Sequence, residues 1–108
     1  MDTAALVALV QDAVPGVGLD AAPSIDPQMT VYVGRDDLPA VARALRDRPD
    51  LAFALLAEVT AVDVWPREPR FEVVYLLISL EHRLRLRLKV RLPGDDAHLA
   101  TMSGLWPS

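Results

Sequence analysis

The sequence predicts an α+β two-layer sandwich, in which two helices cover one face of an antiparallel sheet. Apolar residues recur with helical spacing in two segments of the first half, and three strand-like segments joined by short turns follow in the second half. The length of 108 residues, with 52% hydrophobic and 24% charged residues, is typical of one globular domain. The expected order of elements is α-β-α-β-β-β, with the last three strands paired as a meander.

The first helix is expected at residues 3–14. One helical face of this segment is apolar and consists of Leu6, Leu9, Val10 and Ala13. Asp2 or Thr3 can cap the N-terminus, and a Pro-Gly pair ends the helix. Residues 16–28 contain two further prolines and no regular pattern, which indicates an ordered or partly extended connector.

A short strand at Met29–Val33 precedes the second helix, which is expected to open at residues 34–37 and to end at a proline. Asp36 and Asp37 lie where a helix N-terminus favours negative charge and side-chain caps. The apolar stripe of this helix consists of Leu38, Val41, Ala42 and Leu45. Residues 51–56 are expected to add a short helical turn.

The last three strands are expected at residues 58–65, 71–80 and 84–92. Two prolines between the first and the second mark a turn, because proline cannot donate to a strand ladder. The second strand is apolar on both faces, which is typical of a central strand buried on both sides. The third alternates strictly between inward apolar side chains and an outward basic row, Arg85, Arg87, Lys89 and Arg91.

The chain is expected to form a single domain, residues 1–108, with three parts. Residues 1–28 provide the first helix and the connector, residues 29–96 the α+β core, and residues 97–108 an apolar tail. The apolar residues of this tail are Leu99, Met102, Leu105 and Trp106. In a longer relative we expect the tail to follow a partner subunit. Without that partner it either folds back on the domain or stays exposed, and we expect weak self-association or poor order beyond about residue 96, with association favoured because a contiguous apolar patch in water favours association.

Composition excludes several classes of protein. Without cysteine the chain has no disulfide scaffold, thiolate metal site or iron–sulfur ligand. A net charge of −4 gives no general attraction to nucleic acid, and no apolar run reaches the length of a membrane span. The N-terminus lacks the basic residues of a signal peptide. Charge is uneven along the chain: the first 64 residues are acidic and the remainder is mildly basic.

Candidate catalytic and ligand-binding residues are few. The glycines at 16 and 18 are not flanked by the strand and helix that a phosphate-binding loop needs. His82 and His98 have no partner at metal-ligand spacing, and Asp95 with Asp96 reads as a turn. Asp63 lies in an apolar strand, where it is either on the solvent face, held by hydrogen bonds at a bend, or a catalytic carboxylate.

The basic row of residues 85–91 leaves three interpretations open: a solvated sheet face, a docking surface for a protein partner, or a phosphate-binding surface for nucleic acid. Single-strand readers also need aromatic platforms between the charges, and the outward positions carry none. Glu72 and Glu81 are placed to neutralise part of the row across strands.

Several segments together resemble the C subunit of bacterial respiratory complex I, the NADH-quinone oxidoreductase. They are Thr-Ala-Val-Asp at 60–63, Arg-Glu-Pro-Arg-Phe-Glu-Val-Val-Tyr at 67–75, residues 77–80, residues 84–93 and Leu-Trp-Pro at 105–107. The resemblance spans residues 30–108. It implies a non-catalytic scaffold in the hydrophilic arm of an ion-translocating NADH:quinone oxidoreductase, on the cytoplasmic face of the membrane.

The resemblance also implies partners and cofactors. The protein would dock beside the large subunit that lines the quinone cavity, and it would carry no flavin, iron–sulfur cluster, metal or quinone of its own. We take the basic row with Leu105 and Trp106 as candidate docking residues. Family members continue beyond Leu-Trp-Pro, so we expect this chain to be truncated relative to them. The alternatives are the corresponding subunit of a membrane-bound hydrogenase, a small enzyme using Asp63 or His82, and an unrelated binding module with a basic sheet face.

Overall fold

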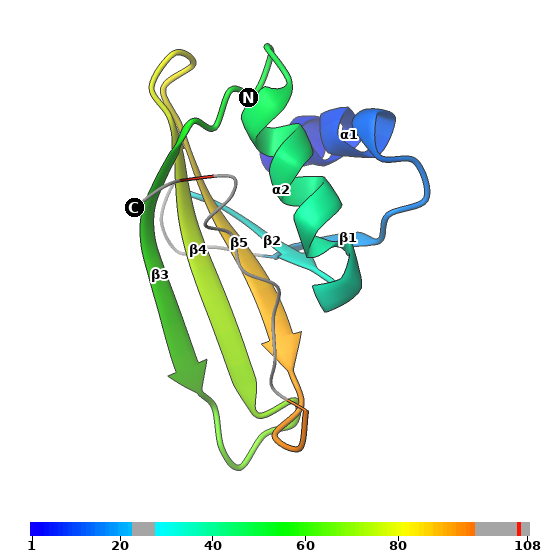
Figure 1. Cartoon of the computed structure of the whole chain (residues 1–108), viewed down its shortest axis with the longest axis vertical. Coiled ribbons are helices and arrows are strands. Elements are labelled where there is room, and N and C mark those ends of the chain that lie inside the picture. Colours follow the sequence, from blue (N-terminus) through cyan, green and yellow to red (C-terminus); the bar gives the residue numbers. More distant parts are fainter. Residues whose placement is uncertain (23–27, 97–105, 107–108) are drawn as a thin grey trace.

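The structure, a computed structural model, describes residues 1–22, 28–96 and 106. Two helices, α1 (Thr3–Ala13) and α2 (Leu38–Asp47), pack on one face of a five-stranded sheet, which confirms the predicted two-layer arrangement (Figure 1). A 3₁₀ turn, η1 (Arg35–Asp37), leads into α2. The strands are β1 (Leu19–Ala22), β2 (Met29–Val33), β3 (Leu55–Asp63), β4 (Phe71–Ser79) and β5 (Leu84–Leu92).

The strands are ordered β1-β2-β5-β4-β3 across the sheet. The last three pair antiparallel, as the predicted meander requires. β2 runs parallel to β5, because the chain crosses over through α2 before it returns to the sheet. The ordered or partly extended connector predicted at residues 16–28 contains a strand that the sequence pattern did not reveal, Leu19–Ala22, which pairs antiparallel with β2 as β1. Four residues are too few to show a pattern with period two.

The predicted stripe of α2 is buried in full, whereas in α1 only Leu6 and Val10 are buried, Leu9 is half-buried and Ala13 is exposed. The backbone N–H of Ala5 donates to Asp2 Oδ1 at 2.8 Å, which confirms Asp2 as the cap of α1. Gly16, with a φ of 86°, lets the chain turn back after the helix. At α2 the expected side-chain cap is absent: Asp36 and Asp37 form the 3₁₀ turn, and Asp37 makes no capping hydrogen bond.

The turn after α2 lies earlier than the one predicted at residues 51–56. The backbone N–H groups of Leu51 and Ala52 donate to the Arg48 carbonyl at 3.0 and 2.8 Å, and residues 52–54 lead into β3 without regular structure. Ala52 adopts a φ of 50° and β3 begins at Leu55. Leu51 and Phe53 are fully buried on either side of Ala52, and the backbone N–H of Phe53 donates to the Leu45 carbonyl at 2.9 Å. Burial of these two side chains fixes the segment more strongly than its helical propensity does.

The core lies between the helices and one face of the sheet. β4 is an interior strand as predicted, and its Tyr75 and Leu77 are buried against the helical layer. Its other face is only half-buried, at Val74, Leu76 and Ile78. The prediction of a strand buried on both sides is therefore wrong for this face, because both helices lie on the opposite one.

Candidate docking face

The face of the sheet opposite the helices carries the basic row, and we call it the open face. All four basic residues of β5 point to this side, because they alternate with the buried residues Leu86, Leu88 and Val90. The cross-strand register gives each one a neighbour on β4; the pairs are Arg85–Ile78, Arg87–Leu76, Lys89–Val74 and Arg91–Glu72. The row therefore runs beside a line of mainly apolar side chains.

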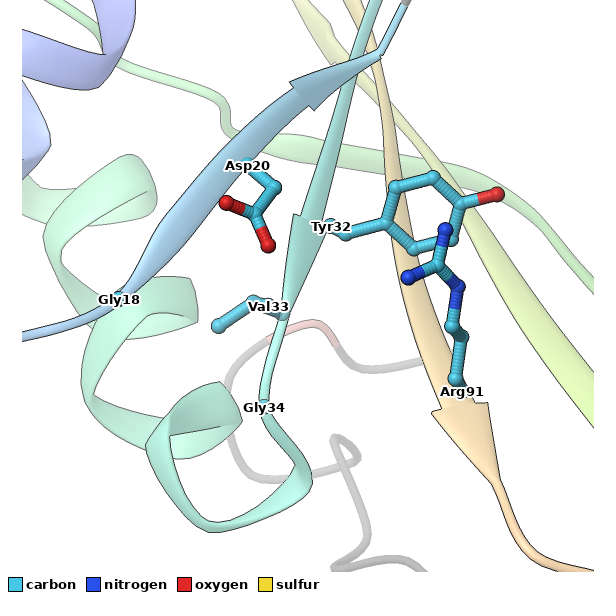
Figure 2. A pocket seen from close by; sticks show the side chains of 6 residues that line it. All are labelled: Gly18, Asp20, Tyr32, Val33, Gly34 and Arg91. Atoms are coloured by element: carbon cyan, nitrogen blue, oxygen red, sulfur yellow. The ribbon is translucent and has the colours of Figure 1, made fainter. Parts of the chain in front are cut away.

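Glu72 organises one end of the row. The Tyr32 hydroxyl donates to Glu72 Oε1 at 2.9 Å, and Lys89 Nζ lies 3.9 Å from Glu72 Oε2. The Arg91 guanidinium stacks on the Tyr32 ring at 3.8 Å from its centroid, while Arg91 Nε lies 4.0 Å from Glu72 Oε1 (Figure 2). Burial raises the pKa of the Tyr32 phenol, and its hydrogen bond to Glu72 raises it further.

Positive charge is therefore unequal along the row. Glu72 partly neutralises Lys89 and Arg91, which confirms the predicted cross-strand neutralisation at this residue. Glu81 instead lies exposed in the turn between β4 and β5. At the far end, Arg85 is exposed and makes no ion pair with any described residue. This end can accept a carboxylate from outside the chain.

On the other half of the open face an apolar band follows β4, and β3 contributes both apolar residues and the polar residues Glu58 and Thr60. Val74, Leu76 and Ile78 of β4 are half-buried, and β3 adds Leu55 and Val62, which are 43% and 40% exposed. Sequence reasoning missed this apolar half, because it assigned β4 to a fully buried position. An apolar band beside a basic row is typical of a surface that contacts another protein.

Two hollows flank the Tyr32–Arg91 stack. One, of about 200 Å³, lies toward β1 and includes Asp20 and Gly34 in its lining (Figure 2). The other, of about 250 Å³, lies beneath the β3–β4 turn and includes Arg67 and Glu68. Both signs of charge line each hollow, Asp20 with Arg91 in the first and two carboxylates with two arginines in the second, so neither has the single sign of charge that would select a small anion or a metal cation.

Asp63 closes the β3–β4 hairpin. Its carboxylate accepts from Arg70 Nη2 at 2.9 Å and from the Trp65 backbone N–H at 3.0 Å. The Arg70 guanidinium holds the pKa of this carboxyl below its ordinary value, and the Trp65 N–H lowers it further. These contacts confirm the interpretation of Asp63 as a hydrogen-bonded residue at a bend.

The other candidates make contacts within the domain where they are described. His82 lies in the β4–β5 turn, with Nε2 2.7 Å from the Pro49 carbonyl oxygen. Asp96 pairs with Arg35 at 3.2 Å. Within residues 1–22, 28–96 and 106, no cluster of three His, Asp or Glu side chains is placed to hold a metal ion. His98 and Leu105 lie outside the described residues.

Trp106 is not on the open face. Its side chain is 7% exposed and belongs to the core cluster, and its indole Nε1–H donates to the Phe53 carbonyl oxygen at 2.9 Å. The sequence-based expectation favoured an exposed apolar tail over one that folds back on the domain. The structure instead buries Trp106 in its own domain, so the basic row and Trp106 do not form one surface.

Comparison with known proteins gives a consistent family. The model of the family described as "Respiratory-chain NADH dehydrogenase, 30 Kd subunit" matches residues 31–108. The C subunit of the NADH-quinone oxidoreductase of Roseiflexus sp. (strain RS-1) is 39% identical over 107 residues, covering 99% of this chain and 61% of the relative. That of Herpetosiphon aurantiacus is 43% identical over 80 residues, covering 74% of this chain and 47% of the relative.

The fold also occurs in a solved respiratory complex. A chain in the structure of the membrane-bound sulfane sulfur reductase, an archaeal respiratory membrane complex, superposes with a TM-score of 0.76 at 25% identity. The match covers 96% of the present chain and 59% of that chain. The present chain thus spans about three fifths of the Roseiflexus relative and of this structural neighbour. No helix in the described part of the chain has the length and hydropathy to cross a bilayer.

Proposed function

The chain belongs to the family of the 30 kDa subunit of respiratory-chain NADH dehydrogenase, which includes the C subunits of bacterial NADH-quinone oxidoreductases, and we propose that it serves as a non-catalytic scaffold in such a complex. In this role it supports electron transfer from NADH to quinone by holding neighbouring subunits in place. The site of action is peripheral, in the hydrophilic arm on the cytoplasmic face of the membrane.

The open face is the observation that carries this proposal. It combines the exposed cation Arg85 with an apolar band at Leu76 and Ile78, and the helical layer covers only the opposite side of the sheet. Such a surface acts by complementarity of shape and charge, which requires no reacting group. The absence of cysteine in the sequence also excludes thiolate ligation of an iron–sulfur cluster by this chain.

The partner we propose is the large subunit that lines the quinone cavity. Affinity isolation of the tagged full-length protein from its native host tests this directly. We expect the large subunit to be recovered in an amount equal to that of the tagged protein, together with other subunits of the hydrophilic arm. Recovery of the tagged protein alone, or with proteins unrelated to respiration, would contradict the proposal.

A second candidate is the corresponding subunit of a related complex, such as a membrane-bound hydrogenase. The observation that supports this alternative is the similarity to a chain of the archaeal sulfane sulfur reductase complex. Deletion of the gene separates the two. Loss of NADH:quinone reductase activity in isolated membranes supports the NADH-linked complex, whereas loss of a hydrogen- or sulfur-linked activity with NADH oxidation intact supports the alternative.

A further inference from the structure

We propose that the open face binds an acidic amphipathic segment of a neighbouring subunit. Apolar side chains of this segment would cover Leu76 and Ile78, and its carboxylates would pair with Arg85 and Lys89. This inference rests on the proposed scaffold function, and it adds the chemistry of the partner.

The register of β4 against β5 places the two kinds of side chain side by side. Ile78 lies opposite Arg85, and Val74 lies opposite Lys89, so each apolar residue has a cation as its neighbour on the same face. A partner that met only the cations would leave the apolar band in water. A purely apolar partner would desolvate the cations without compensation. An amphipathic partner with carboxylates along one side satisfies both.

The preformed cluster at Tyr32 shows how a carboxylate is held on this face. Glu72, whose side chain is 18% exposed, accepts from the Tyr32 hydroxyl and lies 3.9 Å from Lys89 Nζ. Arg85, farther along the row, is exposed and has no such carboxylate among the described residues. We therefore infer that the partner supplies the carboxylate at the Arg85 end.

A second copy of this chain fits the face poorly. Symmetric dimers bring the same patch of both protomers together, so the basic row of one copy would face the basic row of the other. Each copy would bring four cations to the interface, and Glu72 of the same copy partly neutralises Lys89 and Arg91. Repulsion between like charges at an interface disfavours this arrangement.

An anionic membrane fits the face poorly as well. Electrostatic membrane binding takes clusters of about 4–8 basic residues with little opposing charge. Here Glu72 partly neutralises Lys89 and Arg91, Glu58 lies on the same face of β3, and the chain as a whole carries −4. A protein segment with a few well-placed carboxylates matches this balance better than a lipid surface.

Lys89 makes the test possible, because it supplies the amine of the basic row, whose three other members are arginines. A carbodiimide joins an amine to a carboxylate in direct contact, forming an amide bond as the carbodiimide takes up the water that is lost. We would treat the complex isolated with the full-length protein and identify cross-linked peptides by mass spectrometry. We expect Lys89 to be joined to an aspartate or glutamate of another subunit, within a segment that also carries apolar residues at regular spacing.

Two variants control for competing products. Lys89→Arg keeps the charge and should abolish the intermolecular cross-link, which excludes a contribution from other amines. Glu72→Gln removes the carboxylate that lies 3.9 Å from Lys89, so it should abolish the cross-link within the chain and leave the intermolecular one.

The outcomes separate this inference from the proposed function. If the protein is isolated in the complex but Lys89 forms no cross-link to another subunit, the inference is wrong and the scaffold function stands. A Lys89 link between two copies of the chain would also overturn it, as would binding of the protein to vesicles of phosphatidylglycerol and phosphatidylcholine that is lost in Arg85→Glu. If the protein is not isolated with a complex at all, the proposed function fails first.

Discussion

The indole Nε1–H of Trp106 donates to the carbonyl oxygen of Phe53 at 2.9 Å, across an otherwise apolar environment. This bond joins a residue near the end of the chain to the segment between α2 and β3. Phe53 is itself fully buried, so both partners belong to the core. Trp106 therefore contributes to the stability of the domain rather than to an exposed surface.

Trp106→Ala should lower the free energy of unfolding by about 3 kcal/mol or more, because it leaves a cavity and an unpaired carbonyl at Phe53. Trp65 is the matched control, since it is 68% exposed and only its contact with Arg70 would be lost. Trp65→Ala should cost less than about 1 kcal/mol. Urea denaturation of the two variants measures both values, and equal costs would contradict the burial of Trp106.

The alternation of buried and open-face side chains along β5 predicts that substitutions on its two faces differ strongly in their effect on the free energy of unfolding. Leu88 is 2% exposed, so Leu88→Ala should cost about 2 to 5 kcal/mol. Arg85→Ala, on the open face, should cost less than about 0.5 kcal/mol. Chemical denaturation gives the ranking, and the reverse order would place the strand one residue out of phase.

The ion pair between Asp63 and Arg70 predicts how the pKa of the Asp63 carboxyl responds to substitution of the arginine. Arg70→Gln should raise the pKa of the Asp63 carboxyl toward its ordinary value of 3.8, because the guanidinium is the main cause of its depression. Arg67→Gln, in the same turn, should leave that pKa nearly unchanged. Carbon-detected NMR titration of the carboxyl measures both, and an equal effect of the two variants would contradict the assigned contact.

A pKa that is depressed in the folded state has a defined effect on stability. The contribution of Asp63 is present above the carboxyl's unfolded pKa and is lost as the pH falls through its folded pKa. The difference in stability between the wild-type chain and Asp63→Asn should therefore be constant near neutral pH and shrink in acid. Thermal unfolding at a series of pH values checks this; a difference that grows in acid would have the wrong sign.

The edge strand predicts where the isolated chain self-associates. β3 ends the sheet, and Val59 is 54% exposed on it. Val59→Lys should weaken any association seen by sedimentation velocity, because a charge on an edge strand opposes pairing with another strand. Leu80→Lys, at a residue that is 76% exposed beyond the end of β4, is the control and should have little effect. Equal effects would place the contact elsewhere.

The local pattern predicted β5 most accurately. Its alternation is unbroken, so both its bounds and the direction of its basic row follow from period two alone. β1 could not be predicted in this way, because Leu19–Ala22 is short and its position depends on pairing with β2. The course of the chain at Ala52, which has a φ of 50°, depends on the burial of Leu51 and Phe53, which is a tertiary effect.

The candidate site was predictable only in part. The sequence indicates the basic row and its neutralisation by Glu72, since both follow from strand pairing. An apolar pattern on both faces of β4 does not reveal whether another layer of the same chain covers each face. Trp106 illustrates the same limit, because an apolar residue near a terminus fits the core and an interface equally well in sequence.

Binding of the purified full-length protein to the large quinone-site subunit tests the central claim most directly. We predict that Arg85→Glu raises the dissociation constant about tenfold or more, because it reverses the charge of a cation on the open face. The dissociation constant of the variant should also depend less on salt concentration than that of the wild-type protein. Arg43→Glu, at an exposed arginine of α2 in the helical layer, makes the same change of charge and should leave the constant within about twofold. Equal affinities of the wild-type protein and Arg85→Glu, or no binding by the wild-type protein, would contradict the account.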